Sequence, residues 1–248
     1  MSAFTQVEQE AFPSALPFPD YICVDHFLPL GYDYSWVLPY VSSLQWAGDH
    51  GFITIDVPGA GRWHGRPPLR LGTEEEKSRH DELIAHAQAF LSHMSTSLGV
   101  SVSLPMGPRL VVNPGGSSGG DFHRDGINSK SRAVTVLLTE GPPTHFKEVR
   151  RTSSCFPDTE SGSATLFKNA VHRTPKPRSE LGRVVLAFEY EYLPLNDHSR
   201  LPEDLLGYGF GEREIAVAEH WSSIQSGNLS TIVTRSKKTK RQYYNSDM

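Results

Sequence analysis

The segment RLVVNPGGSSGGDFHRDG, residues 109–126, predicts two short β-strands, 109–113 and 121–125, joined by a turn rich in glycine and serine. The second strand contains His123 and Asp125. Side chains two positions apart in a strand point to the same face, so the imidazole and the carboxylate are expected to project together. They can form two corners of a metal site, but two ligands alone bind weakly. Without a third ligand, a surface histidine and a turn aspartate explain the pattern better.

The residues that follow predict a β-rich core. Short apolar runs alternate with turns containing glycine and proline, which is typical of an all-β sandwich or a jelly roll. The further expected strands are 133–139, 145–151, 164–168, 170–173 and 183–193.

A chain of 248 residues suits one domain of this class. We expect residues 1–20 to form a flexible arm and residues 21–108 to form a supporting strand and helices. The β core then occupies residues 109–193, and residues 194–248 form a C-terminal extension.

The best-defined helix is expected to run from Glu74 to Leu98. Thr73 and Glu76 match a capping box, and apolar residues recur at three- and four-residue spacing. Gly99 is the expected left-handed terminator. Further helices are expected at 31–46 and 212–223.

The segment 58–72 is rich in glycine, proline and arginine and contains Trp63 and His64. It is expected to be a long loop near the mouth of a binding site, because long loops in compact domains are often lids. Ordinary loop packing explains the same residues.

Composition excludes several classes of protein. The net charge of −4 gives no general attraction to nucleic acid or to an anionic membrane. Cys23 and Cys155 are the only cysteines, which excludes a disulfide framework and fits a reducing, cytoplasmic location. No apolar run approaches the ~18 residues that span a bilayer, and the first 20 residues lack a signal-peptide pattern. The oligomeric state does not follow from the sequence.

His172 is the best candidate for the third ligand. Two histidines and one carboxylate form the facial triad of non-haem Fe(II) oxygenases, which leaves coordination positions open. Arg183 begins the apolar run VVLAF, and a buried arginine requires an anionic partner. A dicarboxylate co-substrate would supply one, because the guanidinium group binds a carboxylate through two parallel hydrogen bonds.

The H-x-D motif, His172 and Arg183 together resemble the 2-oxoglutarate- and Fe(II)-dependent dioxygenases, with the layout of the prolyl 4-hydroxylase-like branch. The resemblance implies a mainly β fold, with a double-stranded β-helix (jelly roll) core, supporting N-terminal helices and a C-terminal helical extension. It implies that His123, Asp125 and His172 bind Fe(II), and that Arg183 binds the distal carboxylate of 2-oxoglutarate.

Other polar residues near the motif allow two interpretations. Asn113 stands where many relatives carry a tyrosine that contacts the co-substrate, but a turn residue before Pro114 is the simpler interpretation. Arg109 is either a surface charge at a strand end or a contact to substrate or co-substrate. Lys130 and Arg132 are expected to be solvated.

The resemblance implies an enzyme that uses O₂ to oxidise an unactivated C–H bond and converts 2-oxoglutarate to succinate and CO₂. Asp125 argues against halogenation, whereas desaturation, ring closure and epoxidation stay open. The expected substrate is a small metabolite, such as an amino acid or a natural-product intermediate. The alternatives are a protein side-chain (prolyl-type) hydroxylase, an alkylated nucleic-acid demethylase and a non-catalytic jelly-roll metal-binding protein.

Overall fold

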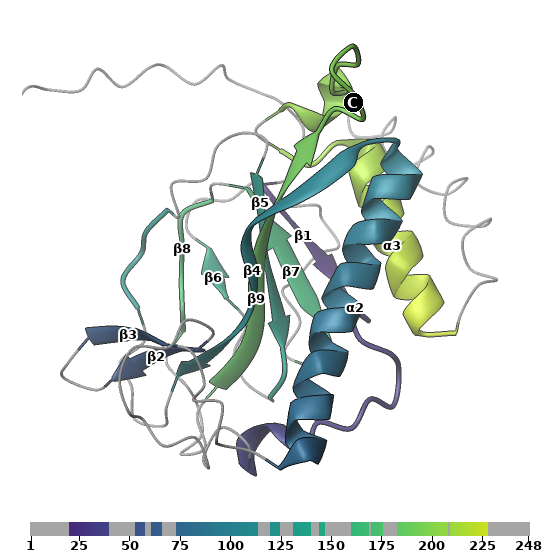
Figure 1. Ribbon diagram of the computed structural model, residues 1–248. Coiled ribbons are helices and arrows are strands. Elements are labelled where there is room, and N and C mark those ends of the chain that lie inside the picture. Colours follow the sequence, from purple (N-terminus) through teal and green to yellow (C-terminus); the bar gives the residue numbers. More distant parts are fainter. Residues whose placement is uncertain are drawn as a thin grey trace, which may run out of the picture.

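The computed structural model describes residues 20–39, 53–57, 61–65, 73–113, 120–124, 131–139, 144–146, 160–168, 170–175, 183–207 and 209–227 (Figure 1). In chain order the elements are β1 (Tyr21–Val24), β2 (Ile53–Val57), β3 (Gly61–Gly65), α2 (Glu74–Leu98), β4 (Ser101–Asn113), β5 (Ser131–Leu137), β6 (His145–Phe146), β7 (Ala164–Phe167), β8 (His172–Arg173), β9 (Arg183–Leu193), the 3-10 helix η1 (Glu203–Leu205) and α3 (Glu212–Gln225).

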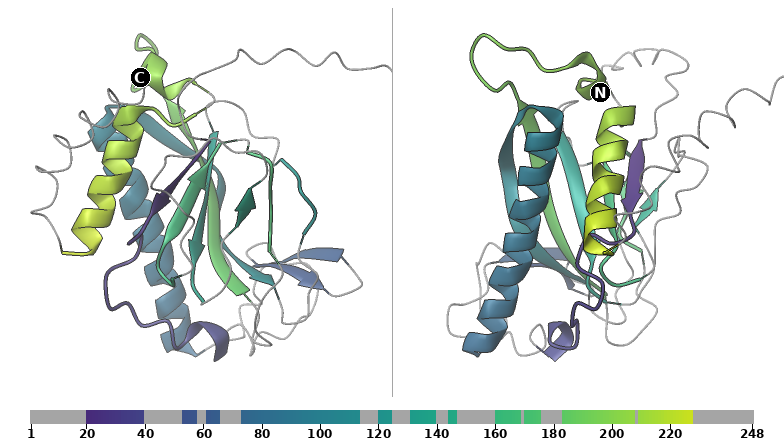
Figure 2. Two further views of the ribbon diagram at one scale, coloured as in Figure 1. Left: turned by 180° about the vertical axis from the view of Figure 1, so that it is seen from behind. Right: turned by 90° about the vertical axis from the view of Figure 1, so that its right-hand side faces the viewer.

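Seven of the described strands form one sheet in the order β1-β7-β5-β9-β4-β2-β3. Its neighbouring strands are antiparallel except for β2 and β4, which are parallel. Strands β6 and β8 form a second, small sheet. The large sheet lies between this small sheet and the helices α2 and α3 (Figures 1 and 2). The expected β-rich fold is therefore confirmed.

Strand β9 shows how the large sheet separates two environments. Val184, Leu186 and Phe188 belong to the main hydrophobic core, which α2 and α3 cover. Val185 and Ala187, which alternate with them, form a smaller cluster on the opposite face. Because successive side chains in a strand point to opposite faces, this second face is the one that can carry a polar site.

Helix α2 has the predicted bounds, Glu74–Leu98. Its apolar stripe is buried, with Leu83, Phe90 and Met94 fully inaccessible. Gly99 follows with a φ of 68°, the left-handed conformation expected of a helix terminator. Periodicity predicted this helix because one continuous face packs against the sheet.

Three expectations about local structure were wrong. Strand β4 begins at Ser101, eight positions earlier than expected, and two register shifts accommodate Pro105 and Pro108. The segment 58–72 is not wholly a loop, because Gly61–Gly65 forms β3 against β2. Residues 121–124 form no regular strand, although His123 forms an isolated bridge.

The structure covers other expectations only in part. The expected strand at 145–151 forms over His145–Phe146, and the residues after it lie outside the described part. The same applies to the helix expected at 31–46, which is helical from residue 37 to 39 and is not described from residue 40 onward.

Helix α3 joins the end of the chain to the core. It extends from Glu212 to Gln225, two residues beyond the prediction. The Trp221 indole donates a hydrogen bond to the Phe27 carbonyl at 3.0 Å, and the Phe90 ring packs against the same indole. The C-terminal extension therefore completes the helical layer.

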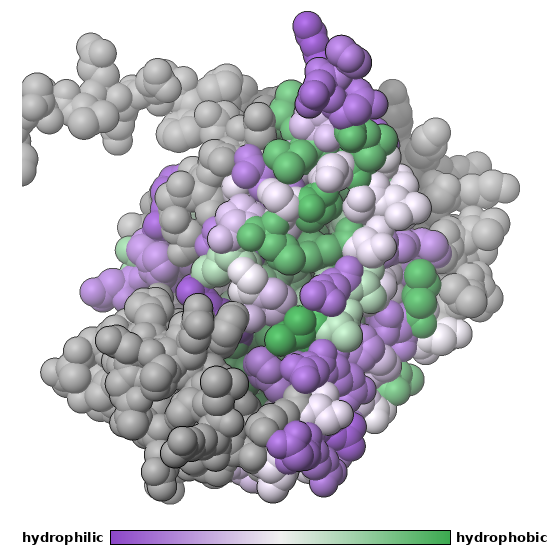
Figure 3. Space-filling view, viewed as in Figure 1, coloured by the Kyte–Doolittle hydropathy of each residue, from purple (hydrophilic) through white to green (hydrophobic). Residues whose placement is uncertain are grey.

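One face of the molecule combines apolar and polar side chains. Figure 3 shows apolar residues gathered beside α2 and between hydrophilic residues at the two ends of this face. Leu104, Leu193 and Leu195 are among the exposed apolar residues near the end of the β4–β9 pair, with 40%, 38% and 63% of their surfaces accessible.

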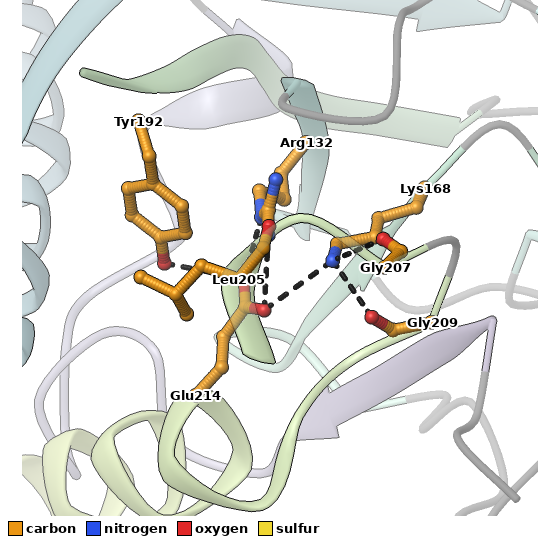
Figure 4. A network of polar contacts seen from close by, with 7 residues as sticks. All are labelled: Arg132, Lys168, Tyr192, Leu205, Gly207, Gly209 and Glu214. Atoms are coloured by element: carbon orange, nitrogen blue, oxygen red, sulfur yellow. Dashed lines mark hydrogen bonds and ion pairs between the residues drawn. The ribbon is translucent and has the colours of Figure 1, made fainter. Parts of the chain in front are cut away.

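A buried network of charges connects the C-terminal segment to the sheet (Figure 4). Arg132 donates from Nε to Glu214 Oε1 at 2.6 Å and from one terminal nitrogen to Glu214 Oε2 at 3.1 Å. The Lys168 ammonium lies 3.6 Å from the same carboxylate and donates to the carbonyls of Gly207 and Gly209. Arg132 and Glu214 are completely inaccessible to solvent. The expectation that Arg132 is solvated was therefore wrong.

Aromatic rings close this network. The guanidinium of Arg132 lies 4.3 Å from the centre of the Tyr192 ring, and the Tyr192 hydroxyl donates to Glu214 at 3.1 Å. Burial raises the pKa of Tyr192, so this hydroxyl keeps the proton that it donates. The hydrogen bonds and the cation–π contact satisfy charges that would otherwise be costly to bury.

Two findings concern the helices and the cysteines. None of the helices in the described part of the chain has the length and apolar character that a bilayer crossing requires. Cys23 is disulfide-bonded, and Cys155, the only other cysteine, lies outside the described residues. One such bond is not a framework.

Candidate functional site

His123 and His172 lie side by side although 48 residues separate them in the sequence. Each donates its backbone N–H to the carbonyl of the other at 2.9 Å, which forms an antiparallel bridge. Directly opposed residues in such a pair project their side chains to the same side. The two imidazole ring centres are consequently 4.6 Å apart.

Hydrogen bonds fix the tautomer of both histidines. Nδ1 of His123 lies 2.9 Å from the Asp121 carbonyl oxygen, and Nδ1 of His172 lies 3.0 Å from that of Ala170. A carbonyl oxygen only accepts hydrogen bonds, so each Nδ1 carries the hydrogen. In the neutral ring, Nε2 then carries the lone pair that binds a metal ion. Nδ1–H donation to a backbone carbonyl is the usual support of a metal-binding histidine.

The third expected ligand, Asp125, lies outside the described residues. Within the part of the chain that the structure describes, no group of three His, Cys, Asp or Glu residues could hold a metal ion. The two histidines therefore form a pair there, and Asp125 as the completing carboxylate stays a prediction from the H-x-D spacing.

A pocket of about 90 Å³ opens beside the histidine pair, with room for a small ligand. Its lining comes from β4, β5, β7 and β9 of the large sheet and from the segments that carry the two histidines. The lining residues among those predicted for the site are His123, His172, Arg183 and Arg109. Thus four of the six predicted residues meet at one pocket.

Arg183 lines this pocket from the first residue of β9. Only 4% of its surface is accessible, and its guanidinium donates to the Thr144 hydroxyl oxygen at 3.2 Å. Because this hydroxyl accepts from Arg183, it can direct its own hydrogen toward a bound carboxylate. The sequence analysis did not identify Thr144, because a threonine in the turn GPPTH carries no signal of its own.

Asn113 and Arg109 occupy different positions relative to the pocket. Asn113 pairs with Arg183 across β4 and β9 and is completely buried, but it is not among the lining residues. Arg109 is half-buried, pairs with Ala187 and lines the pocket. Arg109 therefore lies inside β4 and not at a strand end, and its contact with substrate or co-substrate stays a prediction.

Aromatic rings shield the inner side of the histidine pair. The Phe167 ring centre is 4.5 Å from that of His172, and the Phe146 ring centre is 6.1 Å from that of His172. On the other side of the bridge, the Arg173 guanidinium lies 4.6 Å from the Phe122 ring centre. The contacts with Phe146 and Phe167 pack His172 in place, and Phe167 also lines the pocket.

The donor set fits an Fe(II) ion and a small dicarboxylate. Two Nε2 donors with fixed tautomers are typical of a metal site that also takes a carboxylate ligand. Arg183 and Thr144 supply a charged donor and a hydroxyl in the same pocket, which suits an anionic ligand rather than an apolar one.

Comparisons with known proteins give structural likeness only. No protein-family model and no curated protein matches the chain. AviO1 from Streptomyces viridochromogenes Tue57 is 14% identical, with 75% of this chain and 94% of that chain covered and a TM-score of 0.43. EvdO2 from Micromonospora carbonacea var. aurantiaca complexed with 2-oxoglutarate is 14% identical, with 76% and 93% covered and a TM-score of 0.39.

A third similar structure is HygX from Streptomyces hygroscopicus with nickel and 2-oxoglutarate bound. It is 16% identical, with 78% of this chain and 92% of that chain covered and a TM-score of 0.33.

Proposed function

We propose that this protein is an Fe(II)- and 2-oxoglutarate-dependent oxygenase that oxidises a C–H bond of a small molecule. One observation carries the proposal. Two histidines with Nδ1 fixed on backbone carbonyls line the same small pocket as a buried arginine. A metal-binding end and an anion-binding end in one pocket match a co-substrate that has a chelating keto acid at one end and a carboxylate at the other.

His123, His172 and Asp125 would hold the iron, with Asp125 assigned from its spacing alone. When bound, Fe(II) supplies the activation of O₂ that couples oxidation of the substrate to conversion of 2-oxoglutarate into succinate and CO₂. The backbone bridge between His123 and His172 fixes the separation of their rings before metal binds. Pre-organisation of this kind lowers the ordering cost of coordination.

Arg183 and Thr144 would bind the distal carboxylate of 2-oxoglutarate. Arg183 has little access to water, so a charge-assisted pair with a carboxylate is only weakly screened there. Phe167 and Val185 line the same pocket and give it apolar surface. The substrate then approaches from the part of the pocket that Arg183 does not occupy.

The rival functions have less support. The described residues near the pocket offer no observation that favours a protein side chain or a nucleic acid as substrate. A non-catalytic metal-binding protein would share the histidine pair, whereas a buried arginine in the same pocket suits an anionic co-substrate. Formation of succinate from 2-oxoglutarate in the presence of Fe(II) separates an oxygenase from such a protein.

The direct test is a calorimetric titration of Ni²⁺ and then 2-oxoglutarate into the wild type and three variants, His172→Ala, Arg183→Lys and Arg183→Ala. We expect His172→Ala to lose metal affinity by at least tenfold. Arg183→Lys should keep metal affinity but bind 2-oxoglutarate about 10- to 100-fold more weakly, because lysine lacks the two-pronged donor.

Arg79→Lys, at a partly exposed position of α2, is the matched control and should change neither affinity. Normal binding of 2-oxoglutarate to Arg183→Lys and to Arg183→Ala would overturn the assignment of the co-substrate. Normal metal binding to His172→Ala would overturn the assignment of the metal site.

A further inference from the structure

The imidazole of His172 is held by the chain that leaves strand β7. Phe167, the last residue of β7, is almost completely buried, and its ring centre lies 4.5 Å from that of His172. The Ala170 carbonyl, a little farther along the chain, accepts the hydrogen of His172 Nδ1 at 3.0 Å. Two of the contacts that orient this imidazole therefore come from one short stretch of sequence.

Lys168 connects the same stretch to residues 203–214, which we call the 203–214 segment. The Lys168 backbone N–H donates to the Asp20 carbonyl at 3.1 Å. Its ammonium donates to the carbonyls of Gly207 at 3.1 Å and Gly209 at 2.7 Å, and lies 3.6 Å from the Glu214 carboxylate (Figure 4). Lys168 is only 3% accessible, and hydrogen bonds in a region closed to water are strengthened by the low dielectric.

The 203–214 segment does not itself reach the pocket. None of its described residues lines the pocket, and Lys168 is not a lining residue either. Phe167, in contrast, lines the pocket and is the neighbour of Lys168 in the chain. Because protein interiors are close-packed and transmit displacements, a change in the docking of the segment can reach His172 through Lys168 and the Phe167 ring.

We propose that Lys168 is a positioning residue, which couples docking of the 203–214 segment to metal binding at His123 and His172. This inference rests on the proposed function, because it concerns the metal of the same site. With the segment docked, Lys168 fixes the backbone beside Phe167, and the Phe167 ring keeps the His172 imidazole in one orientation. With the segment undocked, metal binding would also have to order His172, which lowers the affinity.

Coupling of this kind acts in both directions. If docking of the 203–214 segment raises metal affinity by some factor, metal binding must favour docking by the same factor. Groups that directly support a metal-binding histidine contribute about 10- to 100-fold in metal affinity. Lys168 acts through Phe167 and does not touch His172 itself, so we expect a factor of about 10, the lower end of this range.

The first measurement is amide hydrogen exchange of the wild-type protein with and without saturating Ni²⁺. The reporters are the amides of Leu205, Leu206 and Ile215, whose N–H groups donate to backbone carbonyls in or beside the segment. We expect Ni²⁺ to slow their exchange by about tenfold, because the metal favours the docked state. His172→Ala should abolish this effect, which would show that Ni²⁺ acts at the pocket.

The second measurement is calorimetric titration of Ni²⁺ into variants, at a temperature where each of them is folded. Lys168→Met removes the ammonium and should bind Ni²⁺ about tenfold more weakly. The matched control is Leu83→Ala in α2, where Leu83 is completely buried. This change destabilises the protein by leaving a cavity but keeps the contacts of Lys168, so its Ni²⁺ affinity should equal that of the wild type.

Three results would overturn the coupling while leaving the metal site intact. These are unchanged exchange of the reporter amides in wild-type protein saturated with Ni²⁺, wild-type Ni²⁺ affinity in Lys168→Met, and equal loss of affinity in Lys168→Met and Leu83→Ala. The last result would give Lys168 a role in stability alone. If Lys168→Met does not fold, the exchange measurement on the wild type decides.

A failure of the proposed function gives a different result. Wild-type protein that binds no Ni²⁺, or that binds it equally well after His172→Ala, would overturn the metal site and the coupling together. Formation of succinate from 2-oxoglutarate, measured on the same preparations with Fe(II), tests the oxygenase independently. Its absence alongside slowed exchange in Ni²⁺ would overturn the oxygenase and leave the coupling in place.

Discussion

Replacement of Glu214 by glutamine should cost about 3–5 kcal/mol of folding stability. The change removes one negative charge that faces two cations, Arg132 at 2.6 Å and Lys168 at 3.6 Å, in a region closed to water. Glutamine retains an oxygen for the Tyr192 hydroxyl, but one of its new N–H groups must face Arg132. The stability lost is therefore mainly the cost of two buried cations without a counter-charge.

Urea denaturation followed by circular dichroism measures this loss. With a slope of ~1–3 kcal/mol per molar urea, the unfolding midpoint should fall by about 1 M or more. Glu82→Gln is the matched control, because Glu82 forms a partly exposed pair with Arg79 at 3.4 Å. Exposed pairs contribute ~0.2–1 kcal/mol, so this variant should unfold close to the wild type.

A double variant separates charge from packing. The double variant Arg132→Met and Glu214→Gln should lose less free energy of unfolding than the sum of the two single variants. Each single change leaves one buried charge without its partner, whereas the double change removes both charges of this pair. If Glu214→Gln were as stable as Glu82→Gln, the buried network would not hold the C-terminal segment to the sheet, and the reasoning would be refuted.

Three further predictions concern single side chains. Burial lowers the pKa of Lys168 to about 8 in the folded protein, against ~10.4 in an unfolded chain. Between pH ~8 and ~10.4 the unfolded chain therefore binds a proton at Lys168 that the folded protein does not. The free energy of unfolding should consequently rise with pH across this range. Lys168→Met should remove that rise in denaturation curves measured across this range, and an identical pH dependence would contradict it. Trp221→Phe removes the hydrogen bond to the Phe27 carbonyl and should lower the free energy of unfolding by about 1–3 kcal/mol; an unchanged urea midpoint would show that this bond does not hold α3. Thr144→Val should weaken 2-oxoglutarate binding up to about tenfold without changing metal affinity, and calorimetry that shows equal loss of both would assign Thr144 a structural role instead.

Local sequence patterns predicted the helix and the strand whose apolar residues lie within one continuous stretch of the chain. Helix α2 has the bounds Glu74–Leu98 because its apolar stripe, its acidic start and Gly99 are all encoded within one stretch. Strand β9 also has its expected bounds, since a long apolar run is visible without knowledge of its neighbours. Strand β4 was predicted too short, because Pro105 and Pro108 are residues that usually end a strand. The register shifts that accommodate them between β4 and β9 are visible only in the structure.

The chemistry of the candidate site was also readable in part. Few kinds of site combine an H-x-D motif, a later histidine and an arginine at the start of a strand. These residues could therefore be selected from the sequence without a structure. The sequence could not show which other side chains lie beside these residues in the pocket. Thr144 and Glu189 line the pocket, but a threonine in a turn and a glutamate in a strand look the same wherever they point.

Burial of charge was decided by tertiary structure alone. Arg132 stands at the start of a strand and Glu214 in the first turn of α3, positions where charged residues are usually solvated. They become buried because the C-terminal segment folds back over the strand ends and brings together residues 82 positions apart. A sequence pattern records the period of one element and the chemistry of each side chain. Which distant element covers a given face depends on the packing of the whole chain, and that packing appears only in three dimensions.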